Sequence, residues 1–531
     1  MLSRPIALVV ASAAAFAVAA LLLFLAYPQP ASAAIITVDT TMDELNSDGD
    51  CSLREAITAA NTDVAVDVCT AGSVGPDIII VPAGTYVLSI AGTLEDANAT
   101  GDLDVTDSLT IQGASAATTV IDGGGIDRVF HVLSASVNLQ GVTVQGGAAP
   151  GTSGGGIANQ GVLVLTNSAV TGNSAASGAG ISSDLLDTLI LIDSTVSENV
   201  ASSIGGGIYN NGSVVTLTRS TVSGNTATLH AGGIYTLQNF GSLEITDSTV
   251  SGNTATTFNA GGIFIAGAIT VTITNSTISG NTAGQSFGGI YLQQGTLAIT
   301  NSTVTNNSAP FSGGIFDNPS GVTLTNTIVA NQLNGADCSG TITSNGHNLD
   351  SDNTCNLGDP DDLPNNANAN LGPLQNNGGP TLTHALLAGS AAIDAGDAGT
   401  CPATDQRGVA RVGQCDIGSY EAPASTTTPS PTASPPPTAS PPPPTASPPP
   451  TTPPTTPPTT TPTGTPTGTP TATPTATATP DPGTAIPAAL PPTGGTDSSS
   501  SFSLLLIAAM GAALVLTAGG SLAVARSARS E

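Results

Sequence analysis

Three charged residues occupy the same place in successive repeats of this 531-residue chain, and they are its best candidates for catalysis. Asp193, Arg219 and Asp247 each stand directly before a Ser-Thr-Val triplet. If the repeats stack as strands about 4.8 Å apart, the three side chains lie next to one another, with Glu244 nearby. They then form either an enzymatic site or a polar ladder in which Arg219 neutralises two carboxylates. Other repeats carry Asn at this place, so we favour the ladder.

A second set of candidates is aromatic. Five rings directly follow a Gly-Ile step: Tyr209, Tyr235, Phe264, Tyr291 and Phe316. Successive side chains of a strand point to opposite faces, so an inward Ile turns the next ring outward. An exposed strip of rings would bind sugars or a partner surface. The alternative, which we favour, is a ladder whose stacking stabilises the fold. The first two repeats break the strip with Ala158 and Ser182.

The elements that position both sets are short repeats. Gly-Ile steps recur 24 to 29 residues apart, at Ile157, Ile181, Ile208, Ile234, Ile263, Ile290 and Ile315. Each interval has an alternating apolar run, a Ser-Thr-Val-Ser-Gly-Asn-like phrase and a Gly-rich turn, a pattern typical of strands. So short a unit cannot bury a core alone and must stack on copies of itself. We therefore predict an all-β solenoid with roughly ten turns between Ile78 and Leu333.

Stacking also places equivalent Asn residues in one column: Asn173, Asn199, Asn225, Asn253, Asn281 and Asn307. Each side-chain amide can bond to its neighbours above and below while it tolerates a bent backbone. We assign this column to turn architecture and not to ligand binding.

Composition excludes several classes of function. The chain has 37 acidic residues, eight Arg, no Lys and a net charge of −29, which repels phosphate backbones and excludes nucleic-acid binding. The lack of Lys also removes phosphate-loop and Schiff-base chemistry. Two serines, Ser153 and Ser286, match Gly-x-Ser-x-Gly, but no helix follows either, as a nucleophile elbow requires. The four His residues lack metal-ligand spacing.

The two ends predict export and anchoring. Residues 1–33 combine Arg4, an apolar run and Ala31-Ser32-Ala33, as an export signal does. Residues 423–489 are rich in Pro, Thr and Ser, which favours a disordered, extended stalk. Residues 490–531 begin with Leu490-Pro491-Pro492-Thr493-Gly494 and contain an apolar segment, 502–525, that is long enough to span a bilayer. Arginines beyond that segment mark its cytoplasmic side.

All six cysteines lie outside the Gly-Ile repeats. An even number in an exported chain predicts three disulfides, and although sequence cannot fix the connectivity, pairing of neighbours gives the smallest loops. The neighbouring pairs are Cys51 with Cys69, Cys338 with Cys355, and Cys401 with Cys415. Because an open solenoid end exposes strand edges and apolar surface, we expect these disulfides to staple two caps, residues 34–77 and 336–422, around repeats 78–335.

The first cap contains one candidate metal loop. Glu44-x-Asn46-x-Asp48-Gly49, ending at Glu55, is close to an EF-hand calcium loop with Glu in place of the first Asp. The alternative is that Ser52 and Glu55 form a capping box that opens a short helix from Leu53 to Ala60. We favour the helix, and therefore expect no metal or other cofactor, with Ca²⁺ at this loop as the alternative.

Several segments resemble known families. The repeats are similar to right-handed parallel β-helix proteins of the pectate-lyase-like superfamily, and to polymorphic outer-membrane-protein repeats in particular, with Val or Ile where those usually place Phe. The motif Cys51-Ser52-Leu53-Arg54-Glu55-Ala56 resembles the exported-protein domain named for those six residues. The second cap, which contains Asn377-Gly378-Gly379-Pro380 and Asp405-Gln406-Arg407-Gly408, resembles the C-terminal module of choice-of-anchor surface proteins.

The segment from Leu490 onward resembles a cell-wall sorting signal of the Leu-Pro-x-Thr-Gly type. The resemblance implies that a sortase attacks the carbonyl of Thr493, releases Gly494 onward and transfers Thr493 to an amine of a wall precursor. The residues of the signal are Leu490, Pro491, Thr493 and Gly494. The alternative is a plain single-span membrane anchor.

We therefore expect a non-enzymatic β-helix on the outer face of a bacterial envelope, a display rod that adheres to glycans or a partner surface. Its expected partners are a sortase, a wall precursor and, through 502–525, the membrane. The alternative function is a polysaccharide lyase or glycoside hydrolase. Polysaccharide lyases of this fold hold Ca²⁺ against a uronate with acidic residues and abstract a proton with a basic one. The resemblance places those roles on Asp193, Arg219 and Asp247.

Overall fold

The computed structural model describes residues 33–93, 95–318, 321–364 and 368–423. The chain divides into two compact units, Met1–Ala433 and Ser434–Glu531, and all described residues lie in the first. The predicted export signal, stalk, sorting residues and segment 502–525 lie outside the described residues. Within the part that is described, no helix has the length and apolar character needed to cross a membrane.

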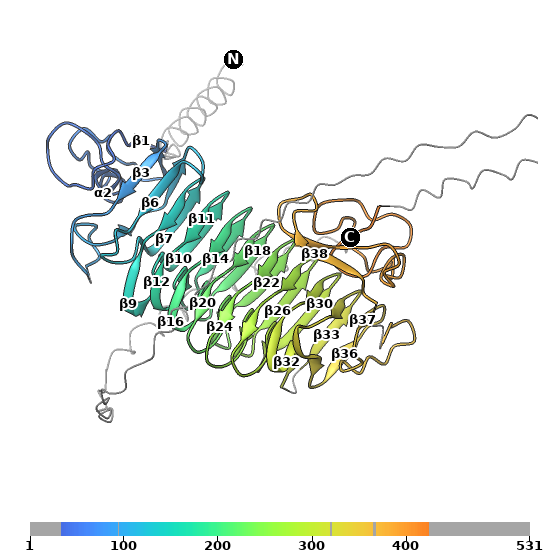
Figure 1. Cartoon of the computed structure of the whole chain (residues 1–531). Helices are drawn as coiled ribbons and strands as arrows, with labels where there is room; N and C mark the ends of the chain where they lie inside the picture. Colours follow the sequence, from blue (N-terminus) through green and yellow to red (C-terminus); the bar gives the residue numbers. More distant parts are fainter. Residues whose placement is uncertain (1–32, 94, 319–320, 365–367, 424–531) are drawn as a thin grey trace, which may run out of the picture. The chain divides into compact units, whose positions relative to one another are not determined.

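The described chain winds into a parallel β-solenoid of about nine turns, which confirms the predicted fold class (Figure 1). Each coil passes through four strand positions; the first, second and fourth belong to a continuous 26-stranded sheet and the third to an 11-stranded sheet. The Gly-Ile steps pair in register, with Ile157 opposite Ile181 and Ile181 opposite Ile208. The repeat length is thus the length of one coil, and the alternating pattern of apolar residues becomes inward and outward columns.

The first position, around the Gly-Ile steps, holds β4 (Leu103–Val105), β7 (Phe130–Gln140), β10 (Ile157–Thr166), β13 (Ile181–Ser183), β17 (Ile208–Asn210), β21 (Ile234–Thr236), β25 (Ile263–Ile265), β29 (Ile290–Leu292) and β32 (Ser308–Asp317). The second holds β1 (Ile35–Thr37), β2 (Asp77–Val81), β5 (Leu109–Gly113), β14 (Thr188–Ile192), β18 (Val214–Thr218), β22 (Ser242–Thr246), β26 (Thr270–Thr274), β30 (Thr296–Thr300), β33 (Val322–Thr325) and β36 (Ile342–Ser344), and β7 and β10 continue into it.

The 11-stranded sheet holds the third position: β3 (Gly84–Val87), β6 (Thr119–Asp122), β8 (Thr143–Gln145), β11 (Ala169–Thr171), β15 (Thr195–Ser197), β19 (Thr221–Ser223), β23 (Thr249–Ser251), β27 (Thr277–Ser279), β31 (Thr303–Thr305), β34 (Ile328–Ala330) and β37 (Leu349–Asp350). The fourth holds β9 (Ala148–Ser153), β12 (Ser174–Ser177), β16 (Val200–Ile204), β20 (Thr226–Ala227), β24 (Thr254–Ala255), β28 (Thr282–Ala283) and β35 (Asn334–Ser339). The Ile of every Gly-Ile step is fully buried, as are Val and Leu columns from the second and third positions.

The predicted Asn column forms a buried hydrogen-bond ladder. Each Nδ2 donates to the Oδ1 of the next Asn at 2.9–3.0 Å, and each backbone N–H donates to the same oxygen at 3.0 Å. The ladder ends on Gln332, whose Oε1 accepts from Asn307. Each amide thereby satisfies polar groups at a turn that is buried and cannot reach water.

The N-terminal cap is organised by helix α2 (Leu53–Thr62), which begins as predicted and extends two residues beyond Ala60. Ser52 and Glu55 form the reciprocal capping box, and the predicted disulfide joins Cys51 to Cys69. Arg54 is 1% exposed and donates to Asp43 Oδ1 at 2.7 Å and to the backbone oxygens of Gly101 and Asp102 at 2.8 and 2.9 Å. This arginine therefore ties the helix to the loop that enters the first coil.

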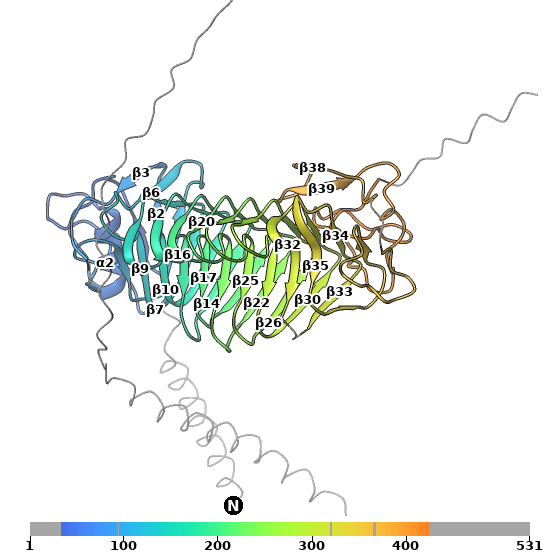
Figure 2. The same cartoon turned by 60° about the horizontal axis from the view of Figure 1, so that its bottom comes forward.

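The C-terminal cap lies partly elsewhere than expected. The predicted Cys338–Cys355 disulfide does lie beside the last coils, where β35 pairs with β32 and β36 pairs with β33. Residues 371–422, however, which include the antiparallel pair β38 (Leu371–Gln375) and β39 (Thr383–Leu386), pack along the flank of the 11-stranded sheet (Figure 2). Ser279 on β27 contacts His384 at 2.8 Å, and Thr277 donates to Gln406 at 2.7 Å.

Removing one amide from the middle of the Asn ladder should destabilise the solenoid. In Asn281→Ala, the oxygen of Val250, the backbone N–H and Nδ2 of Asn253, and Oδ1 of Asn307 lose buried partners. We expect a loss of about 2–4 kcal/mol, seen as a thermal midpoint several degrees lower. Thr282→Ala, next along the chain and exposed, is the matched control and should melt like the wild type. Equal melting of both variants would contradict a stabilising ladder.

Candidate functional site

The charged column predicted from sequence marks a bend of the coil. Asp193, Arg219 and Asp247 all have left-handed backbone conformations, with φ of 49°, 47° and 52°, as do the Asn residues that replace them in other coils. Asn and Asp tolerate this conformation best, which explains why they dominate the column. Arg219 forms a two-pronged pair with Asp193, Nε to Oδ1 at 2.8 Å and Nη2 to Oδ2 at 2.7 Å. The Arg219 and Asp193 side chains remain 41% and 31% exposed.

Asp247 does not complete an open site with this pair. Residues 371–422, the C-terminal module, cover Asp247. Thr381 of this module donates to the backbone oxygen of Asp247 at 2.9 Å, and burial raises the pKa of the Asp247 carboxyl. Among the described residues Arg219 forms its ion pair with Asp193; at Asp247 its charge only partly offsets burial, which raises the pKa of that carboxyl. The column is therefore a polar ladder with one exposed ion pair, an arrangement that contributes little to stability.

Three of the five predicted aromatic binding residues are buried, so the expectation of an exposed strip is wrong for them. Tyr235, Phe264 and Tyr291 are only 4–8% exposed, while Tyr209 and Phe316 are half-buried. Their expected alignment is confirmed, because Tyr235 pairs with Phe264 and Phe264 with Tyr291 across adjacent strands. Consecutive rings lie 4.5–6.0 Å apart between centroids. The column therefore matches the self-supporting ladder that we favoured.

A neighbouring column of loop residues covers the rings. Ala231, Ala260 and Phe287 form one apolar cluster with the aromatic column. Each has positive φ, and Phe287, at 65°, stacks on Phe316 with centroids 3.9 Å apart. A bulky residue is strained in this conformation, so ring contacts must hold Phe287 there. Because this loop folds over the strand face, strand alternation alone could not show that the rings are buried.

Upstream of the first Gly-Ile step, the aromatic column and the positions just before its strands carry ionisable groups that sequence reasoning missed. Strand β4 pairs with β7 and β7 with β10, which places Asp104 and His131 in the aromatic column, next to Ala158. Continuing the register, Asp102 stands one residue before Leu103 and Arg128 two residues before Phe130, where later coils have Gly or, once, Ala179. The available signal was spacing, because Leu103, Phe130 and Ile157 are each 27 residues apart.

These residues form a buried acidic cluster with one arginine. Arg128 Nε lies 2.8 Å from Asp102 Oδ2 and 3.9 Å from Asp127 Oδ1. Burial, reinforced by the charge of Asp104, raises the pKa of Asp102 to about 7 although Arg128 lowers it. A carboxyl that titrates near neutrality is suited to proton transfer, but structural ion pairs show the same shift.

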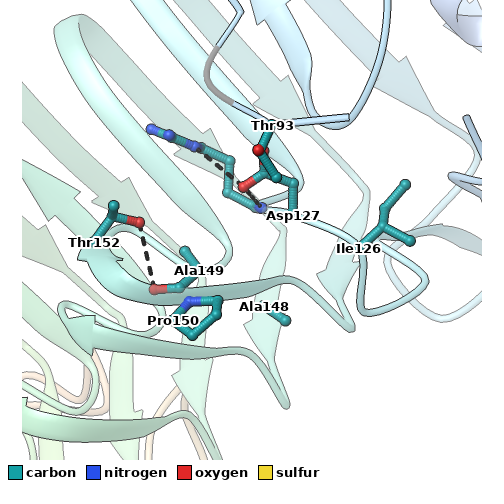
Figure 3. A pocket seen from close by; sticks show the side chains of 8 residues that line it. Thr93, Ile126, Asp127, Ala148, Ala149, Pro150 and Thr152 are labelled. Carbon is teal, nitrogen blue, oxygen red and sulfur yellow. Dashed lines mark hydrogen bonds and ion pairs between the residues drawn. The ribbon is translucent and has the colours of Figure 1, made fainter. Parts of the chain in front are cut away.

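An open cleft borders this cluster (Figure 3). Thr93, Ile126, Asp127, Arg128 and Thr152 are among the residues that line it. Asp127 and Arg128 both line the cleft and belong to the cluster, and Asp127 Oδ1 accepts from the backbone N–H of Arg128 at 2.8 Å.

The predicted calcium loop brings its acidic groups together. Oxygens of Glu44, Asp48 and Asp50 lie within 4.8 Å of one another, and desolvation and the charge of Asp48 raise the pKa of both Glu44 and Asp50. Glu55, however, accepts from the backbone N–H groups of Asn46 and Ser52, both at 3.0 Å. Glu55 therefore serves the helix cap, as the favoured alternative required.

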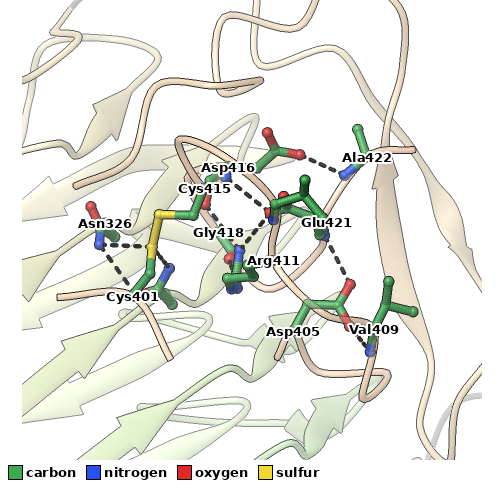
Figure 4. Close-up of polar contacts among 12 residues, drawn as sticks. Asn326, Cys401, Asp405, Val409, Arg411, Cys415, Asp416, Gly418, Glu421 and Ala422 are labelled. Carbon is green, nitrogen blue, oxygen red and sulfur yellow. Dashed lines mark hydrogen bonds and ion pairs between the residues drawn. A yellow bond between two sulfur atoms is a disulfide. The ribbon is translucent and has the colours of Figure 1, made fainter. Parts of the chain in front are cut away.

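The C-terminal module contains a second polar cluster, whose side chains bond to one another and to the coils (Figure 4). Arg411 contacts Glu421 Oε2 at 3.3 Å and donates to the oxygen of Gly418 at 2.8 Å, beside the predicted Cys401–Cys415 disulfide. Arg411 also donates to Asn275 of the solenoid at 3.1 Å. These groups are paired with one another and with the coils, so they attach the module to the solenoid.

Comparison with known proteins adds one structural similarity. No protein-family model matches the chain, and no curated protein matches it in sequence. The crystal structure of pectate lyase Pel9A is similar in backbone, with a TM-score of 0.44 and 15% sequence identity, over 74% of this chain and 97% of that one. No residue role is transferred from this similarity.

The raised pKa of Asp102 predicts a specific pH dependence. The folded chain binds a proton there at about pH 7 and the unfolded chain only near the ordinary value of 3.8, so the stabilising contribution is full below pH 4 and lost as pH rises through 7. Three pH units correspond to about 4 kcal/mol at most. Asp102→Asn should therefore flatten the dependence of the thermal midpoint on pH between 4 and 8.

Asp102→Asn must be compared with a control variant, because other buried carboxyls also make the thermal midpoint fall as pH rises. Burial raises the pKa of Asp350 and Asp416 to about 6. Asp63→Asn, at an exposed helix end where Asn also tolerates the left-handed backbone, is the matched control and should keep the wild-type slope. An unchanged slope in Asp102→Asn would show that Asp102 does not titrate in this range.

Proposed function

We propose that this chain is an exported, surface-anchored display rod, which makes adhesive or glycan contacts through its sides and catalyses no reaction. The proposal rests on how the structure places the candidate residues: they are packed or paired with other residues of the chain. The aromatic column is packed under loop residues, and Arg219 is paired with Asp193 while Asp247 lies under the module. The candidate groups are thus packed, paired or covered, and they do not converge in an open groove.

Two further features support a rod. The buried Asn ladder links coils from Asn173 to Gln332 without interruption, which makes the solenoid stiff along its axis. Disulfides at both ends suit an oxidising, extracellular setting. With the rings covered, contacts to a glycan or partner would come from the exposed Ser, Thr and Asn side chains.

The second candidate function is cleavage of an acidic polysaccharide. The cluster of Asp102, Asp127 and Arg128 beside the cleft favours it, since it combines carboxylates, a guanidinium and a carboxyl with a pKa of about 7. Against it, the carboxylates of the cluster would repel an anionic sugar unless a cation lay between them.

Activity assays separate the two candidates. The purified chain should show no turnover of polygalacturonate or other acidic glycans, with or without Ca²⁺, when product formation is followed by ultraviolet absorbance and reducing ends. Turnover that Arg128→Ala or Arg219→Ala abolishes, while the Thr282→Ala control retains it, would overturn the display proposal in favour of an enzyme.

Anchoring is tested by fractionating cells that produce the chain. If Thr493 is joined covalently to the wall, wall-digesting enzyme should release the protein and detergent should not. Thr493→Ala should shift it to the detergent-released fraction, because the acyl-transfer residue is lost while segment 502–525 remains. Release of the wild type by detergent alone would favour the plain membrane anchor.

A further inference from the structure

Three side chains from the start of the solenoid converge on one point at the N-terminal end of the aromatic column. Asp104 and His131 are neighbours on β4 and β7, and Asp96 reaches them from the loop before β4. His131 Nδ1 lies 3.3 Å from Asp104 Oδ1 and 3.4 Å from Asp96 Oδ1. One ligand atom from each residue lies within 4.8 Å of the others.

Hydrogen bonding does not account for this convergence. Asp104 is fully buried, and its Oδ1 accepts no hydrogen bond from any described residue. The distances from His131 Nδ1 to Asp104 Oδ1 and to Asp96 Oδ1 both exceed the usual 2.7–3.2 Å range of a hydrogen bond. A buried carboxylate oxygen without a donor is costly, so a missing partner is expected at this point.

We propose that Asp96, Asp104 and His131 bind a divalent transition-metal ion of the Zn²⁺ type. Bonds of about 2.1 Å to a tetrahedral ion place its ligands about 3.4 Å apart, which is the spacing of Nδ1 from the two carboxylates. One imidazole and two carboxylates suit Zn²⁺, whereas Ca²⁺ prefers six to eight oxygens. Three protein ligands leave one position for water or another oxygen ligand.

Hydrogen bonds in the surroundings of the site hold one of these ligands, Asp104. The other oxygen of Asp104, Oδ2, accepts from the N–H of Asn98 at 2.9 Å. Asn98 in turn donates through Nδ2 to the oxygen of Arg54 at 2.9 Å. The ligand is thereby oriented by a chain of contacts that begins in helix α2, as outer hydrogen bonds orient ligands in metal sites. The small side chain of Ala158 follows His131 in the column and leaves the imidazole uncrowded on that side.

Metal content and affinity test this site on the full chain, independently of its role as a rod. After a chelator has removed bound metal and Zn²⁺ has been added back, the wild type should retain one equivalent of Zn²⁺ at Asp96, Asp104 and His131. Asp96→Asn and His131→Gln should each lower the affinity at least tenfold. Asp96 is 70% exposed on its side chain, so its variant should melt like the wild type in the presence of chelator.

Asp361→Asn is the matched control, because Asp361 is 68% exposed and its Oδ2 lies 3.9 Å from His347 Nε2, and no described residue completes a group of three metal ligands with them. It should bind zinc as the wild type does. Co²⁺ in place of zinc should give the intense visible bands of a tetrahedral ion in the wild type and not in Asp96→Asn. Absence of retained zinc in the wild type, or equal retention in Asp96→Asn and His131→Gln, would overturn the proposal.

Discussion

The in-register stacking of coils through the Asn ladder is the interaction on which the rest of this structure depends. Each coil must bury a polar turn, and an unsatisfied amide there would cost more than one ordinary hydrogen bond contributes. Asn meets this need because its carbonyl oxygen serves the N–H and the amide of the preceding coil, while its own amide reaches a third group. The coils vary in length between Gly-Ile steps, yet the ladder keeps its register, so the loops between the strands must absorb the variation.

Stacking also decides how much could be predicted from sequence. A repeat that equals one coil makes equivalent residues into neighbours, so the Ile core, the Asn ladder and the alignment of the rings follow from the pattern. The disulfides followed from short separations of 14 to 18 residues. The burial of Phe264 did not follow, because it depends on Phe287 and its equivalents turning back over the strand in a left-handed conformation. Nor could the repeats show that Thr277 meets Gln406, 129 residues away.

Part of the ionisable cluster at the start of the solenoid could have been predicted from the sequence. Continuing the 27-residue spacing upstream places Asp104 beside His131, and it puts Asp102 and Arg128 where later coils have Gly or Ala. The Gly-Ile signature is absent from these coils, which hid the register. The side-chain distances were beyond sequence reasoning, since Asp96 comes from a loop whose path is set by Glu95, which accepts from the N–H groups of Ala97, Ala99 and Thr100.

The Cys51–Ala56 motif explains why the polar coils stand at this end of the rod. A solenoid's first coil has no predecessor to satisfy its outer groups, and here Arg54 supplies donors to three backbone oxygens, at Asn98, Gly101 and Asp102. Its charge is balanced by Asp43, whose Oδ2 accepts from the N–H of Ile90 at 3.0 Å. A planar guanidinium with five donors can serve so many acceptors at once, and an ammonium cannot. With these backbone groups satisfied from the cap, the first coils carry buried Asp104 and His131 in the column where later coils have aromatic rings.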